Sequence, residues 1–166
     1  IFEAARAVPR YDGMGTTLVV VAWHAAGVTW GHVGDSRLYL LRSGALRQLT
    51  RDHSIVQEQL GHGAISREEA RYSVNRNVLT RAVGIDPYVE ADVRSSDVEP
   101  DDVYLLCSDG LTDMLTDEEI AATLREFGPR IRVAATRLID AANARGGLDN
   151  ISVIVARVIG PDGRRA

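Results

Sequence analysis

The sequence has few of the features that mark secreted, membrane or nucleic-acid-binding proteins. A single cysteine, Cys107, excludes an internal disulfide and fits a reducing compartment. No apolar run reaches the roughly 18 residues of a membrane span, and no signal peptide is recognisable. The 19 basic and 23 acidic residues are spread evenly at a net charge of -4, which argues against a nucleic-acid or anionic-membrane partner. We expect a cytoplasmic protein, and we also expect a monomer.

The length favours one domain. The chain has 166 residues, 45% of them hydrophobic, and a domain typically needs about 100–200 residues. We expect a single domain over 1–160 and a disordered tail over 161–166. The chain begins without methionine, inside an apolar-periodic stretch, so we expect that its N-terminus is cut.

The first half is dominated by strand patterns. Short apolar or alternating runs are separated by Ala26-Gly27 and Ser43-Gly44, which are compatible with hairpin turns. These runs predict an antiparallel meander of strands at 16–24, 28–34, 37–42 and 45–50. The following segment, 54–77, is polar, and we expect helices over 54–60 and 66–72, the second with a Ser66/Glu69 capping box. A Gly61, His62, Gly63 loop is expected between them.

The second half predicts two strands, two helices and a last strand. Strands are expected at 89–96 and 102–107, and a helix begins after Thr116, which forms a capping box with Glu119. Pro129 is predicted to begin the next helix. The inner positions of the two helices are Ile120, Leu124, Phe127, Ile131, Ala134, Leu138 and Ala142. Residues 151–158 are apolar on both faces, which favours a central strand. The fold class is α+β, with antiparallel sheets covered by helices.

Several catalytic motifs are incomplete. Cys107 lacks the arginine that a cysteine phosphatase carries after its nucleophile, so the thiol is interpreted as core packing. The sequence GDSRL at 34–38 lacks the closing glycine of a nucleophile elbow, and GMGTTL at 13–18 lacks the third glycine of a dinucleotide fingerprint. The four histidines show no zinc-ligand spacing, and isolated histidines are more often structural.

Three aspartates remain, each at the end of a predicted strand. Asp35 and Asp109 follow strands and Asp149 precedes one. Carboxylates that share a small volume need a counter-cation, and such hard oxygen ligands suit Mg²⁺ or Mn²⁺. The alternative is that each aspartate makes a turn or a helix cap, which is its commonest use at such positions.

Six segments in order resemble the blocks of the metal-dependent serine/threonine phosphatases, the protein phosphatase 2C family in its compact bacterial form. The resemblance extends from about residue 10 to residue 158, and its segments are GMGTTL (13–18), GHVGDSRLYLLRSG (31–44), LTRDHS (49–54), RNVLTRAVG (76–84), LLCSDGLTD (105–113) and GGLDNISVIV (146–155). The resemblance implies two packed antiparallel β-sheets flanked by helices. It implies cytoplasmic signalling by dephosphorylation of proteins that a serine/threonine kinase modifies.

The same resemblance assigns the site residues. Asp109 and Asp149 match ligands of a binuclear Mg²⁺ or Mn²⁺ centre, and Asp35 matches a ligand to a third ion that it shares with Asp109. Asn150 is expected to orient Asp149, with Ser108 and Gly110 beside Asp109, where Gly110 would allow a tight turn. Segment 54–77 corresponds to the mobile flap of the family, here with Gly61, His62, Gly63 and Asn77.

One departure from the family pattern is large. The Asp-Gly-His-Gly-Gly run, whose aspartate bridges the two main metals, and the upstream phosphate-binding arginine are both absent. The chain therefore resembles the C-terminal two-thirds of a catalytic domain, and alone we expect it to be inactive. The implied mechanism of the intact domain is attack on phosphorus by a metal-activated water without a covalent intermediate. The alternatives are a non-catalytic partner-binding module of the same fold and, more distantly, a phosphatase that acts on a transcription-factor antagonist.

Overall fold

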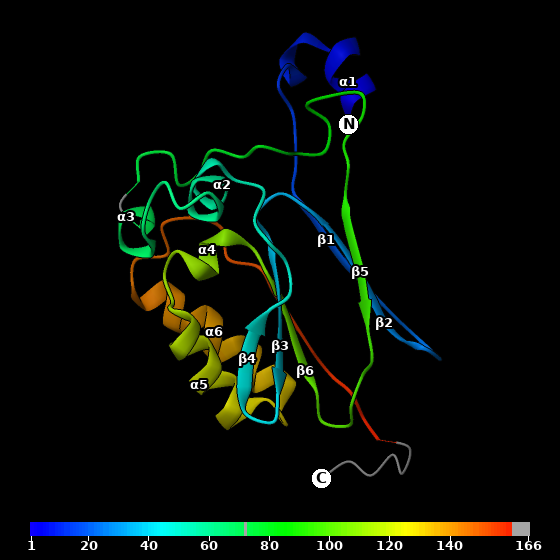
Figure 1. Cartoon of the computed structure of the whole chain (residues 1–166), viewed down its shortest axis with the longest axis vertical. Helices are drawn as coiled ribbons and strands as arrows, with labels where there is room; N and C mark the ends of the chain where they lie inside the picture. Colours follow the sequence, from blue (N-terminus) through cyan, green and yellow to red (C-terminus); the bar gives the residue numbers. More distant parts are fainter. Residues whose placement is uncertain (72, 161–166) are drawn as a thin grey trace. The chain divides into compact units, whose positions relative to one another are not determined.

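The fold contains two sheets with helices, as Figure 1 shows. The computed structural model describes residues 1–71 and 73–160, so the predicted tail 161–166 lies outside it. The strand order is β1-β2-β5 in the smaller sheet and β4-β3-β6-β7 in the larger. The chain forms two compact units. The first comprises Ile1–Ala22, Thr29–Ser36 and Arg51–Arg94, and the second comprises Trp23–Val28, Arg37–Thr50 and the described residues from Ser95 onward.

The strands and helices predicted for the smaller sheet and the first unit are present in the structure, which also has two short elements before residue 12. In chain order, all these elements are α1 (Phe2–Ala7), a 3-10 turn (Pro9–Tyr11), β1 (Leu18–His24), β2 (Gly27–Val33), α2 (Ile55–Gly61), α3 (Arg67–Arg71) and β5 (Asp92–Ser96). Ser54 caps α2, because its side chain accepts a hydrogen bond from the Gln57 N–H at 3.2 Å. The predicted Ser66/Glu69 capping box is confirmed, since each residue's backbone N–H donates to the other's side chain.

Two predictions in this region are wrong in detail. Gly61 is the last residue of α2, so the loop between the helices begins at His62. The turn between β1 and β2 uses Ala25 and Ala26, and Gly27 already belongs to β2 with a φ of 128°. The predicted end of the second helix, Tyr72, lies outside the described residues.

The predicted four-strand meander is also wrong. After β2 the chain passes through Gly34, whose φ of 98° ends the extended strand, and β3 (Arg37–Arg42) joins the larger sheet. There β3 pairs antiparallel with both β4 (Ala45–Gln48) and β6 (Val103–Cys107). Residues from Leu38 to Leu41 are all buried, so side chains on both faces of β3 are shielded from solvent.

The core of the second unit lies between the larger sheet and two helices. The helices α5 (Asp117–Phe127) and α6 (Ile131–Ala144) cover one face of that sheet (Figure 1). The predicted inner residues Ile120, Leu124, Ala134, Leu138 and Ala142 are buried, and Thr116 and Glu119 form the predicted capping box. Cys107 packs in this core, which confirms its structural interpretation.

Two further predictions for the second unit are corrected. The helix α6 begins at Ile131, two residues after Pro129, and Ile131 is 39% exposed although it lies on the same face as the buried Leu138, since it is the first residue of the helix. The last strand, β7 (Val153–Arg157), pairs only with β6 among the described strands, so it is an edge strand and Ile154 is exposed. An apolar pattern on both faces does not reveal how many neighbours a strand has.

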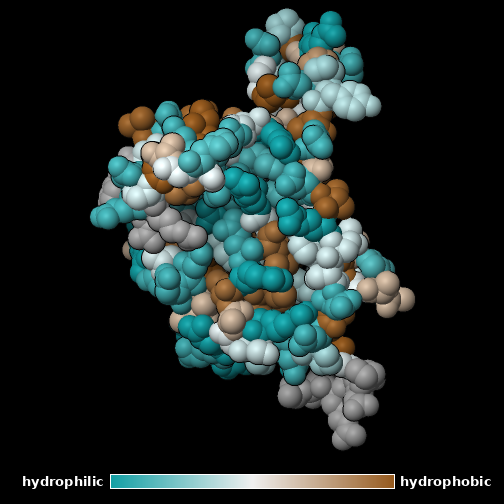
Figure 2. All heavy atoms as spheres, in the orientation of Figure 1, coloured by the Kyte–Doolittle hydropathy of each residue, from teal (hydrophilic) through white to brown (hydrophobic). Residues whose placement is uncertain are grey.

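The face seen in Figure 2 is mostly hydrophilic, with separate apolar patches. None of the described helices has both the length and the apolar character that crossing a membrane requires.

Candidate metal centre

Asp109 lies where a fully buried strand meets a short helix. All five residues of β6 are buried, and Asp109 begins α4 (Asp109–Thr112) one residue after Ser108. The carboxylate is partly buried, and its Oδ1 accepts a hydrogen bond from the Gly110 N–H at 2.9 Å. This bond fixes one oxygen and leaves the other available to a cation.

Asp149 lies on the chain segment that leads into β7. Its side chain is exposed, and its Oδ1 accepts a hydrogen bond from the Asn150 N–H at 2.6 Å. The Asn150 contact to the carboxylate therefore comes from the backbone. The part of Asn150 in orienting Asp149 around a metal stays a prediction.

Ser108 connects the two segments that carry these aspartates. Its N–H donates to the Ser152 carbonyl at 3.1 Å, and its Oγ accepts from the Ser152 N–H at 3.0 Å. The same hydroxyl donates to the Asn150 carbonyl at 3.0 Å. The backbones that precede Asp109 and follow Asp149 are thus held side by side.

Gly110 permits this close approach, which differs from the tight turn predicted for it. It belongs to α4, and a Cβ at this position would collide with the Asn150 carbonyl oxygen and lie 3.5 Å from the Asp149 carbonyl carbon. Any larger residue would push the Asp149 segment away. Two carboxylates on adjacent backbones offer the hard oxygen ligands that suit Mg²⁺ or Mn²⁺, so these residues fit such ions.

Asp35 belongs to the first unit and follows β2 and Gly34. A Cβ at Gly34 would collide with the Thr17 side chain, and the Thr17 hydroxyl lies 2.8 Å from that of Ser36. His53 also contacts Gly34: its Nδ1 accepts from the Gly34 N–H, and its backbone N–H donates to the Gly34 carbonyl. Three of the six segments that resemble the family, 13–18, 31–44 and 49–54, therefore meet next to Asp35. Whether Asp35 shares a metal with Asp109 stays a prediction.

The predicted flap lies entirely within the first unit. His62, Gly63 and Asn77 are exposed, as is Gly61 at the end of α2. Asn77 also lines a hollow of about 780 Å³, together with residues of the 13–17 and 78–90 segments. Asn77, at the end of the predicted flap, therefore lies beside this hollow.

Comparison with known proteins decides the family. The sequence profile of the family described as Protein phosphatase 2C matches residues 4–151. The chain belongs to the protein phosphatase 2C family. Among its relatives in this family, the serine/threonine phosphatase stp of Listeria monocytogenes is 43% identical over 159 residues, which are 93% of this chain and 62% of that protein. The serine/threonine protein phosphatase PstP of Mycobacterium tuberculosis is 40% identical over 93% of this chain and 29% of its own length.

Solved structures of protein phosphatase 2C members have the same fold. The crystal structure of Mycobacterium tuberculosis PstP matches with a TM-score of 0.89 and 38% identity, covering 95% of this chain and 66% of that one. A crystal structure of the PstP catalytic domain in complex with two manganese ions matches with a TM-score of 0.86 and 38% identity, over 95% of this chain and 65% of that one. This chain spans a little under two thirds of the length of these structures and of the Listeria phosphatase.

Sequence reasoning missed one group of residues in the first unit. His32, His53 and Asp92 come together there, although each looks isolated in the sequence. His32 lies two residues before GDSR and His53 lies within DHS, and the spacing of these histidines and Asp92 in the sequence does not reveal that they form a cluster.

Proposed function

We propose that this chain is part of a metal-dependent phosphatase that hydrolyses phosphoserine and phosphothreonine in proteins. The observation that carries the proposal is the pairing of the Asp109 and Asp149 segments at the ends of β6 and β7, in a chain of the protein phosphatase 2C family. Its relatives are named serine/threonine phosphatases, which supports phosphorylated proteins as the substrate class.

The residues of this chain would hold and orient the metal ions. Asp109 and Asp149 would bind the main Mg²⁺ or Mn²⁺ ions, and Asp35 would bind a third. When bound, such ions supply Lewis acidity and neutralise charge for hydrolysis of a phosphate ester by water. The hydrogen bonds of Ser108 would keep the two main carboxylates at a fixed spacing, because they fix the backbone on both sides. The flap would contact the protein chain around the phosphate.

The absent upstream motif affects what the chain does alone. Residues 1–166 contain no Asp-Gly-His-Gly-Gly run, which in this family supplies the bridging carboxylate. Misplacement of reacting groups by a small distance costs about 10²-fold in rate, and loss of a bridging ligand should cost more. We infer that this chain hydrolyses phosphopeptides poorly unless the upstream motif is present.

The missing motif also favours a second candidate, a non-catalytic partner-binding module of the same fold. A binding module has no chemical need for carboxylates on paired strand ends, however, so the Asp109 and Asp149 arrangement supports the enzyme. The two candidates differ in their need for divalent cations: the phosphatase needs them for hydrolysis, and the binding module does not hydrolyse phosphopeptides with or without them.

The test is hydrolysis of a phosphothreonine peptide with Mn²⁺ by residues 1–166 and by a version extended upstream to include the motif. We expect turnover only by the extended version, its loss on chelation, and a fall of at least about 10²-fold in its Asp149→Asn variant. Metal-independent turnover would contradict the metal assignment. Failure of the extended version to hydrolyse any phosphopeptide, with Mn²⁺ shown by calorimetry to be bound, would favour the binding module.

A further inference from the structure

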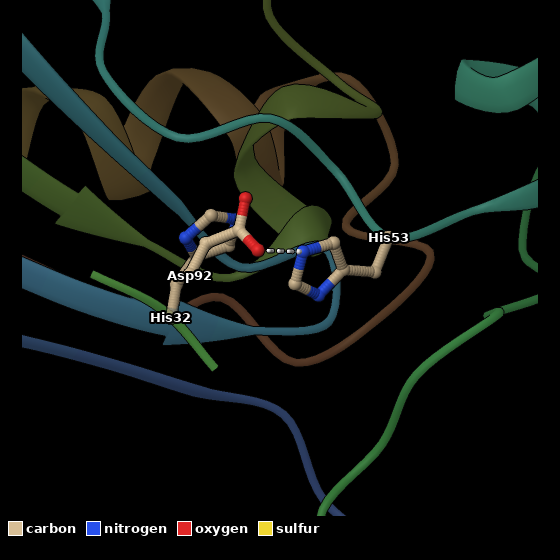
Figure 3. Close-up of side chains that lie close together, drawn as sticks. All are labelled: His32, His53 and Asp92. Atoms are coloured by element: carbon tan, nitrogen blue, oxygen red, sulfur yellow. Dashed lines mark ion pairs between the residues drawn. The ribbon is translucent and has the colours of Figure 1, made fainter. Parts of the chain in front are cut away.

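A cluster of two histidines and an aspartate lies within the first unit. His32 comes from β2, His53 from the segment between β4 and α2, and Asp92 from the first position of β5. One donor atom of each lies within 4.8 Å of the donor atoms of the other two, as Figure 3 shows from close up. The two imidazole rings stack, with centroids 4.6 Å apart, and the histidines are only 3% and 7% exposed.

His32 has a buried ring nitrogen without a partner. Its Nε2 lies 2.8 Å from the Arg51 carbonyl oxygen, which can only accept, so Nε2 carries the ring proton. The neutral ring then has a lone pair on Nδ1. Of the buried side-chain nitrogen and oxygen atoms that the structure describes, this Nδ1 is the one with no hydrogen-bond partner. Buried polar atoms nearly always have a hydrogen-bond partner or bind an ion, so this unpaired lone pair marks a position where a ligand could bind.

The hydrogen bond of His32 to a backbone carbonyl is also the arrangement that metal-ligating histidines use. Such a histidine donates its second ring N–H to a carbonyl or carboxylate, which fixes the tautomer and the direction of the free lone pair. Arg51 supplies that carbonyl here.

The distance between His53 and Asp92 fits a common metal ion. His53 Nε2 lies 3.5 Å from Asp92 Oδ1. Tetrahedral Zn²⁺, with bonds of about 2.0–2.2 Å to nitrogen and oxygen, places neighbouring ligand atoms about 3.3–3.5 Å apart. His53 Nε2 and Asp92 Oδ1 are therefore already as far apart as two ligand atoms of one Zn²⁺ would be. Arg81 donates to this same oxygen, Asp92 Oδ1, at 3.0 Å. A carboxylate oxygen has two lone pairs, so Oδ1 can accept from Arg81 and still bind a metal.

We propose that His32 Nδ1, His53 Nε2 and the Asp92 carboxylate form a binding site for a zinc-class transition-metal dication. The site is separate from the Asp109 and Asp149 centre in its ligand chemistry, and its existence does not rest on the phosphatase function. Imidazole nitrogen favours Zn²⁺, Co²⁺ or Ni²⁺ over Mg²⁺, which prefers oxygen ligands. A water molecule would complete the coordination.

The protonation states of the cluster favour the metal. Burial lowers the pKa of His53, and the nearby His32 and Arg81 lower it further, so the ring is neutral at pH 7. Burial raises the pKa of Asp92, but the hydrogen bond from Arg81 and the Arg81 charge help to lower it overall, so the carboxylate is ionised at pH 7. Few protons therefore compete with a metal at neutral pH.

Binding has one structural consequence. Without metal, His53 Nδ1 accepts a hydrogen bond from the Gly34 N–H at 3.2 Å, which puts the ring proton on Nε2, facing Asp92. The contact of Arg81 Nη1 with Nε2 is longer, at 3.4 Å, and does not outweigh this bond. Ligation through Nε2 moves that proton to Nδ1, which can then no longer accept from Gly34. The metal would thus break a bond to the residue that precedes Asp35.

The test uses a protein in which Asp109→Asn and Asp149→Asn weaken the carboxylate centre. Zn²⁺ is titrated by calorimetry and Co²⁺ by visible absorption. We expect one ion of each to bind, with a Co²⁺ spectrum typical of a four-coordinate nitrogen-containing site. His32→Gln should weaken binding by more than the roughly 10–100-fold that loss of a supporting hydrogen bond costs. Gln can still donate to the Arg51 carbonyl but has no nitrogen at the Nδ1 position.

His62→Gln is the matched control, because His62 is exposed on the flap and lies outside the cluster. It should bind Zn²⁺ as tightly as the parent. Parent protein that binds no Zn²⁺, or His32→Gln that binds it as tightly as the His62 control, would overturn the proposal.

A second variant and a spectroscopic measurement guard against misfolding. Asp92→Asn should weaken Zn²⁺ binding to a similar extent, and circular dichroism should report whether each variant is folded. In a ¹⁵N-labelled parent, Zn²⁺ should shift the Nδ1 resonance of His32 and the amide resonance of Gly34. Zn²⁺ binding that leaves both resonances unchanged would place the ion elsewhere and overturn the assignment.

Discussion

His53 hydrogen-bonds to both backbone polar groups of Gly34. The His53 N–H donates to the Gly34 carbonyl at 3.0 Å, and the Gly34 N–H donates to His53 Nδ1 at 3.2 Å. Gly34 is buried and has a φ of 98°, a conformation that favours glycine. One residue therefore fixes the backbone directly before Asp35, the predicted ligand of a third metal.

His53→Ala should destabilise the fold by about 1–3 kcal/mol, because it leaves the buried Gly34 N–H unsatisfied. His53→Asn should recover part of that loss, since the Asn Oδ1 can accept where Nδ1 does. The measurement is urea unfolding followed by tryptophan fluorescence. Equal destabilisation by the two variants would show that ring packing, and not the hydrogen bond, is what His53 contributes.

Gly110→Ala should displace the Asp149 segment, because the added Cβ would collide with the Asn150 carbonyl. Overpacking of this kind costs about 1–3 kcal/mol of stability, and we also expect weaker Mn²⁺ binding in calorimetry. Gly31→Ala is the matched control, since a Cβ there meets its nearest neighbour, Val93, at 3.5 Å. Unchanged Mn²⁺ affinity in Gly110→Ala would argue against a metal shared by the two segments.

Ser108→Ala should loosen the same pair of segments by another route. It removes the hydroxyl that joins Asn150 and Ser152, at about 0.5–1.5 kcal/mol for each hydrogen bond. The exchange of the Ser152 amide hydrogen should become faster and Mn²⁺ binding weaker. Ser96→Ala serves as the control, because that hydroxyl bonds the neighbouring Asp97 carbonyl. Slow exchange at Ser152 in the Ser108 variant would mean that β6 and β7 hold the segments without the hydroxyl.

Arg42→Ala should be among the most destabilising charge deletions in the second unit. Arg42 bonds both oxygens of Asp102, whose side chain is 1% exposed. Removing one partner of a fully buried pair costs about 3–5 kcal/mol because the other charge stays buried. We expect a value near the lower end of this range, because the Arg42 side chain is 30% exposed. Arg157→Ala is the control, since its partner Asp101 is 73% exposed and such pairs contribute about 0–1 kcal/mol. Similar unfolding midpoints for the two variants would contradict this assignment.

The pH dependence of the Asp102 pair has a definite sign. Burial raises the pKa of Asp102, but the hydrogen bonds from Arg42 and the Glu99 N–H and the Arg42 charge lower it overall. A carboxyl whose pKa is lower in the folded state stabilises fully above its unfolded pKa, about 3.9, and loses this contribution as the pH falls through the folded pKa. The stability difference between the parent and Arg42→Ala should therefore shrink below pH 4. A constant difference from pH 6 to pH 3 would show that Asp102 does not titrate with the pair.

Local signals in the sequence predicted local structure well. Ser66 and Thr116 each cap a helix as predicted, because the capping partner lies three residues ahead. Ser54 was expected inside the helix 54–60, but it caps α2, which begins at Ile55. The bounds of β3 follow from an apolar run that ends at a Ser43-Gly44 turn. Asp109 and Asp149 were found because each lies beside an apolar strand.

Features that depend on distant residues could not be predicted in this way. Nothing near Arg37 indicates that β3 pairs with β6, and nothing in 151–158 indicates that β7 has one neighbour. The reason for Gly110 lies in the Asn150 carbonyl, which only the fold brings near. Likewise His32, His53 and Asp92 meet because β2, β5 and the segment before α2 pack together.

The order of the larger sheet also sets the order in which the candidate metal centre can assemble. Strand β7, which Asp149 precedes, is the last described strand, and it pairs with β6, which Asp109 follows. Because synthesis proceeds from the N-terminus, β6 is made well before its second neighbour, and its edge stays open meanwhile. Asp109 and Asp149 should therefore come together late in folding, after β3 and β6 have paired, and a nascent chain halted before β7 would contain Asp109 but no partner for it.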